Sequence, residues 1–153
     1  ISDLSDSYSP NWTRESYFGR TEGISKYVNT DRTISVNFTI IADDADDLES
    51  IYKKLNWLAQ AVYPKYKENS AAYGYESSPI LRMRIGDLIK YNSTGIGGYL
   101  TTLDYAYSMD AGWEVTTVGK KVPKKIDVSM AFTVIHDFMP DFGSTFYDVK
   151  AVN

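Results

Sequence analysis

The chain has 153 residues, of which 43% are apolar and 24% charged, and a formal net charge of −4 at pH 7. These proportions are typical of one globular domain and argue against a disordered chain, and the acidic balance argues against a general nucleic-acid binder. The sequence has no cysteine and a single histidine, His136, which excludes disulfides, thiolate metal sites and multi-histidine metal sites. No run approaches the about 18 uncharged apolar residues of a membrane helix, so we expect a soluble segment without membrane insertion.

The first part of the chain is predicted to be a polar arm followed by a hairpin. Residues 1–15 are rich in Ser, Asp and Asn, so we expect an arm or linker outside the core. Residues 17–28 form a glycine-broken strand pattern, and Asn29, Thr30 and Asp31 have the chemistry of a turn. The sequence therefore predicts a hairpin of 17–28 with 32–41.

The segment 33–40 has the clearest alternation in the sequence. One face carries small neutral polar side chains, namely Thr33, Ser35, Asn37 and Thr39. The other face is apolar and consists of Ile34, Val36, Phe38 and Ile40. This pattern predicts a strand with two different faces. The polar face is either an ordinary solvated sheet face, which the pattern alone favours, or the wall of a water-filled passage.

An acidic cluster at 43–47 precedes a run of apolar residues at three- and four-residue spacing. Carboxylates at this position cap free N–H groups and suit the helix dipole, so we expect a helix from about 45 to 62 that ends before Pro64. A calcium loop is disfavoured because the spacing and glycine of an EF-hand are absent.

The second half predicts further strands. Residues 65–78 are polar and are expected to form a surface loop. Alternating or apolar runs predict strands at 80–85, 99–109 and 126–135, with a short strand at 113–115. The strands precede and follow the helix without βαβ alternation, so the fold class is mainly β, a β-sandwich or partial barrel of about six antiparallel strands with one flanking helix.

The domain organisation that follows has three parts. We expect an N-terminal arm or linker at 1–15, one β domain at 16–138 and a C-terminal tail at 139–153. The tail is aromatic and broken by Pro and Gly, so we expect it to wrap over a surface or to reach a neighbouring molecule.

A search for catalytic chemistry finds little. The sequence GIGG at 95–98 lacks the following Lys and Ser or Thr of a phosphate loop. His136 and Asp137 are adjacent at a strand end, where successive side chains point to opposite faces, so they are not expected to converge. We therefore expect no catalytic residues, no metal site and no cofactor.

The aromatic content of 14%, with 13 Tyr, 6 Phe and 3 Trp, is high. It is typical either of core and subunit contacts or of a sugar-stacking platform on a β-sandwich. Tyr105 and Tyr107 keep the apolar phase of their strand, which favours core and contacts. Aromatic side chains expected at subunit or ring contacts are Tyr8, Trp12, Tyr66, Tyr73, Tyr75, Phe142, Phe146 and Tyr147.

Six segments spread over residues 17–138 form an ordered set. They are GRTEGISKYVNTDRTISVNFTI at 19–40, YKKLNWLAQAVYPKY at 52–66, SPILRMRIGDL at 78–88, GYLTTLDY at 98–105, GWEV at 112–115 and KKIDVSMAFTVIHDF at 124–138. In order and spacing they resemble the tail-tube domain of baseplate tube proteins in contractile-tailed phages, particularly T-even-type phages. Gly23 and Gly112 stand where that family pattern has proline, which leaves open whether the branch is a phage tail or a related contractile injection machine.

The resemblance implies a structural role in a virion tail or baseplate, assembled in the host cytoplasm. Such domains form a six-fold ring, and hairpins from all subunits join around an axial channel. Implied partners are further copies of the chain, adjacent tube or baseplate rings, the tape-measure protein, the surrounding sheath and passing DNA that is not specifically bound. Thr33, Ser35, Asn37 and Thr39 would then line the channel.

Two other classes of function stay open on sequence grounds. A secreted carbohydrate-binding β-sandwich would use the Tyr and Trp side chains. A hydrolase would need His136 beside a carboxylate in a cleft. The first would be a monomer that holds sugar, whereas the ring protein would self-associate.

Overall fold

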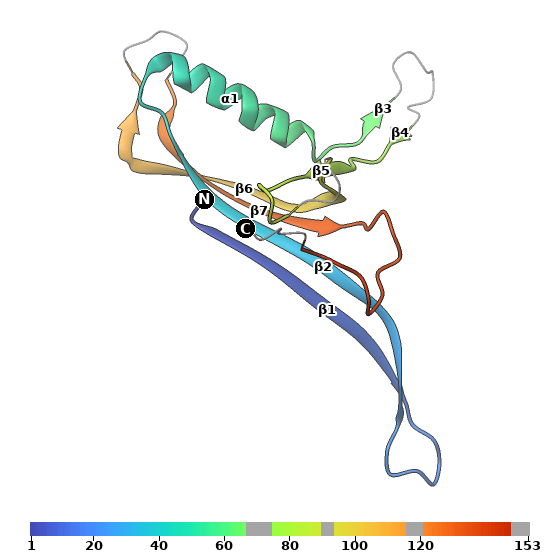
Figure 1. Ribbon diagram of the computed structural model, residues 1–153. Helices are drawn as coiled ribbons and strands as arrows, with labels where there is room; N and C mark the ends of the chain where they lie inside the picture. The colour runs from blue at the N-terminus through green and yellow to red at the C-terminus, as the bar shows by residue number, and fades with distance from the viewer. Residues whose placement is uncertain (67–74, 90–93, 116–120, 148–153) are drawn as a thin grey trace, which may run out of the picture.

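The computed structural model describes residues 1–66, 75–89, 94–115 and 121–147. The elements in chain order are β1 (Asp3–Glu15), β2 (Ile24–Ile41), α1 (Ala45–Gln60), β3 (Lys65–Tyr66), β4 (Tyr75–Ser77), β5 (Leu81–Met83), β6 (Ile96–Trp113) and β7 (Pro123–Val134). Five strands form one antiparallel sheet in the order β1-β2-β7-β6-β5, and β3 and β4 form a separate two-stranded sheet (Figure 1). The prediction of a mainly β fold with antiparallel sheets and one flanking helix is confirmed.

Helix α1 covers one face of the main sheet (Figure 1). Leu55 packs against Ile126 and Val128 of β7, and the hydroxyl of Tyr105 on β6 donates a hydrogen bond of 2.9 Å to the Leu55 carbonyl oxygen. The expected helix is therefore present with a buried stripe, and it ends at Gln60. This helix, rather than a second extended sheet, forms the layer opposite that end of the main sheet.

The middle of the same sheet face is covered by the chain that follows β5. Ile34 and Phe132 of the sheet are buried together with Ile89 and Ile96. Residues 85–89 form a short turn closed by a bridge between Ile85 and Ile89. We call this side of the sheet the covered face and the opposite side the open face.

The segment 1–15, expected to be an arm or linker, is instead largely the edge strand β1 of the main sheet. The expected turn at Asn29, Thr30 and Asp31 is also wrong, because β2 runs through it without interruption. The hairpin therefore joins β1 to β2 through 16–23. Cross-strand hydrogen bonds explain how polar side chains sit here in a strand, since the Asn11 amide donates to Asn29 Oδ1 at 3.0 Å and to Asp31 Oδ2 at 2.9 Å.

The two hairpins of the main sheet extend past it at opposite ends. The last pair between β2 and β7 at one end is Thr33 with Thr133, yet β2 continues beyond it to Ile24, paired only with β1. Figure 1 shows this part of the β1–β2 hairpin reaching beyond the other strands. At the other end β6 continues past its last regular pair, Ser108 with Lys125, to Trp113. The sheet is therefore strongly staggered.

Two smaller expectations are also corrected. Part of the expected loop 65–78 is the two-stranded sheet of β3 and β4, and residues 67–74 lie outside the described residues. Trp113 does not open a separate strand but ends β6, after Gly112 at a φ of 72°. Gly112 in the left-handed conformation and the register shift between Ser108 and Trp113 interrupt the regular alternation of β6. The sequence of this one strand therefore resembles two separate strands.

Gly98 lies where β6 crosses the core, and we expect Gly98→Ala to destabilise the fold. An added Cβ would overlap the Thr133 carbonyl oxygen and lie 2.7 Å from two ring carbons of Phe132. Such overpacking costs about 1–3 kcal/mol, measured as the free energy of urea unfolding. Gly97→Ala is the matched control, because its Cβ would meet nothing closer than 3.4 Å. Equal stability of the two variants would contradict this packing.

Candidate functional site

The open face of the main sheet is a grid of small polar side chains. Residues directly opposite each other in antiparallel strands point to the same face, so the pairings place each row on one side. Across β1, β2, β7 and β6 the rows are Ser7, Thr33, Thr133 and Tyr99; Ser5, Ser35, Ala131 and Thr102; Asp3, Asn37, Ser129 and Asp104; and, without a β1 member, Thr39, Asp127 and Ala106. None of these residues is buried. The four side chains predicted as one polar face of a strand therefore lie in the middle of a much larger surface.

The four rows carry only acidic charge. Asp3, Asp104 and Asp127 are their charged members, whereas the next row of the same face, Ile41, Lys125 and Ser108, adds one lysine at the end of the sheet where β7 begins. Neighbouring polar groups contact two of these carboxylates: the Thr39 hydroxyl donates to Asp127 Oδ1 at 2.5 Å, and the Asn37 amide lies 3.5 Å from Asp3 Oδ2. These four rows therefore repel polyanions and offer little for an apolar chain to adhere to.

The main sheet has two long free edges among the described residues. β1 is the terminal strand on one side and pairs only with β2. On the other side β5 pairs with β6 only at Ile96, Gly97 and Gly98, so β6 has no described strand partner on that side from Tyr99 onward. Unpaired edges of this length present rows of free N–H and C=O groups, which makes them templates for pairing with another chain.

These two edges match each other in direction and in polarity. The strands β1, β2, β7 and β6 alternate in direction, so β1 and β6 run oppositely, and the β6 edge of a second copy placed beside β1 would continue the antiparallel order. Both edges also carry polar residues on the open face and apolar ones on the covered face: Ser5 beside Leu4 on β1, and Asp104 beside Leu103 on β6. Edge pairing would therefore keep the polar grid continuous.

A buried ion pair lies beneath β1 on the covered face. Arg32 of β2, only 2% exposed, binds the Asp6 carboxylate through two hydrogen bonds of 2.9 and 2.7 Å. The Tyr147 hydroxyl donates to Asp6 at 2.6 Å, and the guanidinium lies 5.1 to 5.7 Å from the ring centres of Tyr8, Phe146 and Tyr147. The cluster joins the N-terminal strand to the C-terminal segment, and no local motif in the sequence indicates it.

Two pKa shifts follow from this cluster. Burial alone would raise the pKa of Asp6, but hydrogen bonds from Arg32 and Tyr147 and the charge of Arg32 outweigh it, so the pKa lies below its ordinary 3.8. Burial, and then the charge of Arg32, lowers the pKa of His136 from 6.5. Both shifts mean that the unfolded chain takes up a proton more readily than the folded one.

Stability is therefore expected to fall in acid in two windows. The contribution of His136 is fully present above pH 6.5 and declines as the pH falls below it, and that of Asp6 is present above pH 3.8 and is lost as the pH falls through its lowered pKa. Urea unfolding between pH 8 and 3 measures both. His136→Phe, which cannot titrate, is expected to remove the upper window only. A variant that keeps the upper window would contradict the assignment.

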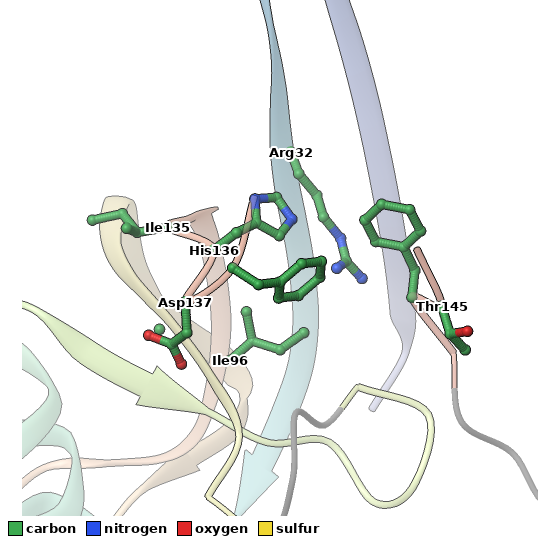
Figure 2. A pocket seen from close by; sticks show the side chains of 9 residues that line it. Arg32, Ile96, Ile135, His136, Asp137 and Thr145 are labelled. Carbon is green, nitrogen blue, oxygen red and sulfur yellow. The ribbon is translucent and has the colours of Figure 1, made fainter. Parts of the chain in front are cut away.

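His136 and Asp137 do not form an acid–base pair. Figure 2 shows the imidazole turned toward Arg32 and the Asp137 carboxylate turned away from it. The His136 ring packs edge-on against Phe138 and Phe146, with centroids 5.7 and 6.1 Å away, while Asp137 binds Arg82 at 2.9 Å. A hydrolytic site built on this histidine has no geometric support in the described residues.

The aromatic residues expected at contacts between subunits fall into three groups. Tyr8, Phe146 and Tyr147 contact each other or Arg32 within the chain. Trp12 on β1, Tyr66 on β3 and Phe142 are exposed. Tyr73 lies outside the described residues, and Tyr75 lies in β4.

A cleft of about 690 Å³ lies between the β1–β2 hairpin and the segment that follows β7. Tyr27 and Val28 line one side and Met139 and Phe142 the other, and all four are exposed. The exposed apolar side chains of this cleft therefore lie beside the sheet and beyond it, whereas Ile41, also exposed, lies on the open face in the row next to Thr39.

The described residues contain no group of three or more His, Cys, Asp or Glu side chains placed to hold a metal ion. Within the same parts of the chain, no helix has the length and apolar character to cross a lipid bilayer. Comparison with protein-family models gave no match, and comparison with curated proteins gave none.

Proposed function

We propose that this chain is a structural assembly protein without catalytic activity. Its copies would join edge to edge into a six-fold ring of a contractile-tail baseplate or tail tube, with the open face lining the channel for the tape-measure protein and DNA. The observation that carries the proposal is the pair of free edges, on β1 and β6, that match in direction and polarity around an uncovered polar face. The number six and the tail context rest on the sequence resemblance.

The stagger of the sheet supports ring closure. A sheet can close on itself only if successive strands are displaced along their length, because closure requires tilted strands. Here the β1–β2 hairpin extends past Thr33 at one end and β6 extends past Ser108 at the other. Copies of a flat sheet without this displacement could pair edge to edge in an open ribbon as easily as in a closed ring.

The chemistry of the open face fits a passage for DNA. The carboxylates of its four rows, Asp3, Asp104 and Asp127, outnumber the single Lys125 of the next row and repel phosphate, and the hydroxyl and amide groups of these rows leave no strong site for a passing chain to bind. In a ring these carboxylates would recur in every subunit. Tape-measure protein and DNA would both pass through the channel without binding specifically to its wall.

The carbohydrate-binding alternative loses support from the same face. A sugar-binding platform needs aromatic rings that lie flat on one surface, and Tyr99, at the β6 margin, is the aromatic member of the described rows. The exposed Trp12, Trp57 and Trp113 lie on β1, α1 and β6 rather than in one group on this face.

Light scattering at rising protein concentration tests the proposal. Particles of six copies, or stacks of them, are the expected result, because edge pairing is intermolecular and gains from concentration. Addition of a panel of oligosaccharides serves as the second arm. A protein that stays a single copy at every concentration and binds a sugar would contradict the proposal and support the alternative.

A further inference from the structure

The last described segment of the chain, residues 135–147, returns from the end of β7 to the beginning of β1. It starts with a hydrogen bond of 2.8 Å from the Ile135 N–H to the Gly97 carbonyl oxygen on β6. It ends with Phe146 and Tyr147 against Arg32 and Tyr8. We call this segment the strap, since it crosses the covered face from one side of the sheet to the other.

Side-chain contacts fasten the strap at two points, and a hydrogen-bonded turn lies between them. Near its start Asp137 binds Arg82 in two contacts of 2.9 and 3.3 Å. Near its end the Tyr147 hydroxyl donates to Asp6 at 2.6 Å. Between these points Asp141 and Ser144 exchange hydrogen bonds that close a turn, including one of 2.8 Å from the Ser144 hydroxyl to Asp141 Oδ1.

β1 has few other contacts on the covered face that would hold it. It pairs with β2 alone, and an edge strand in a ladder of that kind frays easily. Leu4 is half-buried against the core, and beyond Tyr8 every β1 residue is exposed. The Asp6 carboxylate is the one acidic group in the cluster, and it serves both Arg32 and Tyr147.

We propose that the strap is a latch that keeps the first half of β1, Asp3 to Tyr8, ordered on the sheet, and so sets whether this edge can receive a second copy of the chain. The part of the proposal that concerns the second copy rests on the proposed function; the ordering of β1 does not. With Tyr147 bound, the rings of Tyr8, Phe146 and Tyr147 exclude water from the Arg32–Asp6 pair, which strengthens that pair. Without the Tyr147 contact, β1 would lose the aromatic rings that cover Asp6 on the covered face.

Hydrogen exchange of the full chain, read by mass spectrometry, tests the ordering of β1. Tyr147→Phe keeps the ring and removes the hydroxyl. We expect amides of residues 3–8 to exchange about tenfold faster or more, since a hydrogen bond to a charged group is lost, while amides of β7 keep their rates. Tyr17→Phe is the matched control, because it removes a tyrosine hydroxyl that donates to Glu15 at 2.7 Å at the far end of the hairpin.

Two exchange results would overturn the latch. One is an unchanged rate at residues 3–8 in Tyr147→Phe, and the other is an equal increase in every strand, which would mean general destabilisation. Asp137→Ala, which opens the other fastening, provides a second variant should Tyr147→Phe fail to fold. It is expected to give the same local change at residues 3–8.

Light scattering of the same variants tests whether the strap controls assembly, separately from whether the chain forms a ring. Where the unchanged chain assembles, Tyr147→Phe is expected to need about tenfold more protein for the same assembly, in proportion to the loss of ordered edge, and Tyr17→Phe is not. Equal assembly of Tyr147→Phe and the unchanged chain would overturn control of the edge by the strap. Failure of the unchanged chain to assemble on any platform counts against the ring alone, and the exchange rates still decide the latch.

Discussion

Replacement of Asp6 by alanine is expected to lower the free energy of unfolding by about 3–5 kcal/mol, because it leaves the Arg32 guanidinium buried without its counter-ion. Arg32 is 2% exposed and receives both of its short carboxylate contacts from Asp6. Its aromatic neighbours cannot replace a carboxylate. The measurement is urea unfolding at pH 7, where Asp6 is ionised in the folded and the unfolded chain.

Asp3→Ala is the matched control for this prediction. It makes the same chemical change on the same strand, but Asp3 is exposed and its carboxylate has one long contact, at 3.5 Å to the Asn37 amide. Its effect is expected to stay within about 0.5 kcal/mol, as for most surface changes. A double variant, Asp6→Leu with Arg32→Met, is expected to recover much of the lost stability, because it removes both charges together. An effect of Asp6→Ala as small as that of Asp3→Ala would contradict the buried pair.

The second large effect is expected on genome passage. Ser35→Lys with Asn37→Lys places two cations per copy in the middle of the open face, among rows whose charged members, Asp3, Asp104 and Asp127, are acidic. We expect folding and ring assembly to persist, because these half-buried side chains border open solvent and lysine can extend into it. DNA ejection from particles that carry this chain is expected to fall roughly tenfold, since each lysine can bind a phosphate.

Two controls sharpen that experiment. Ser35→Thr with Asn37→Gln keeps the face neutral and is expected to eject normally. Ser50→Lys with Asn56→Lys adds the same charge on the exposed side of α1, away from the open face, and is expected to leave DNA ejection unchanged. Normal ejection by the Ser35 and Asn37 lysine variant would contradict the assignment of a channel wall.

Local patterns in the sequence predict much of this fold. The acidic start and the apolar spacing give α1 to within two residues, and alternation in 126–135 matches the buried and exposed sides of β7. Both signals come from residues close together in the chain, whose apolar side chains recur on one face of the helix or strand. The strands expected at 99–109 and 126–135 lie within β6 and β7, and the two strands pair antiparallel as the expected fold class requires.

The failures have a common cause in long-range pairing. Composition made residues 1–15 resemble an arm, although Ser5, Ser7 and Ser9 alternate with Leu4 and Tyr8 as a strand requires. Asn29 and Asp31 have turn chemistry in isolation, yet their side chains bond to Asn11 on the neighbouring strand. In both segments the strand conformation is stabilised by pairing between β1 and β2, which the local sequence does not reveal.

The candidate site shows the same division between local and distant information. Thr33, Ser35, Asn37 and Thr39 were identifiable as one face from a single strand. The rest of the grid required the register of four strands, because Ser129 and Asp104 join the Asn37 row only through pairing. The Asp6, Arg32 and Tyr147 cluster joins three distant parts of the chain, and only the folded topology brings them together.

The most direct test of edge-to-edge assembly is an electron cryo-microscopy map of the protein at high concentration or on its nucleating platform. We expect a closed ring in which β1 of one copy is hydrogen-bonded to β6 of the next, with Ser35 and Asn37 turned toward the central opening. A map in which another molecule, or another copy, packs flat against the open face while both edges remain unpaired would contradict it.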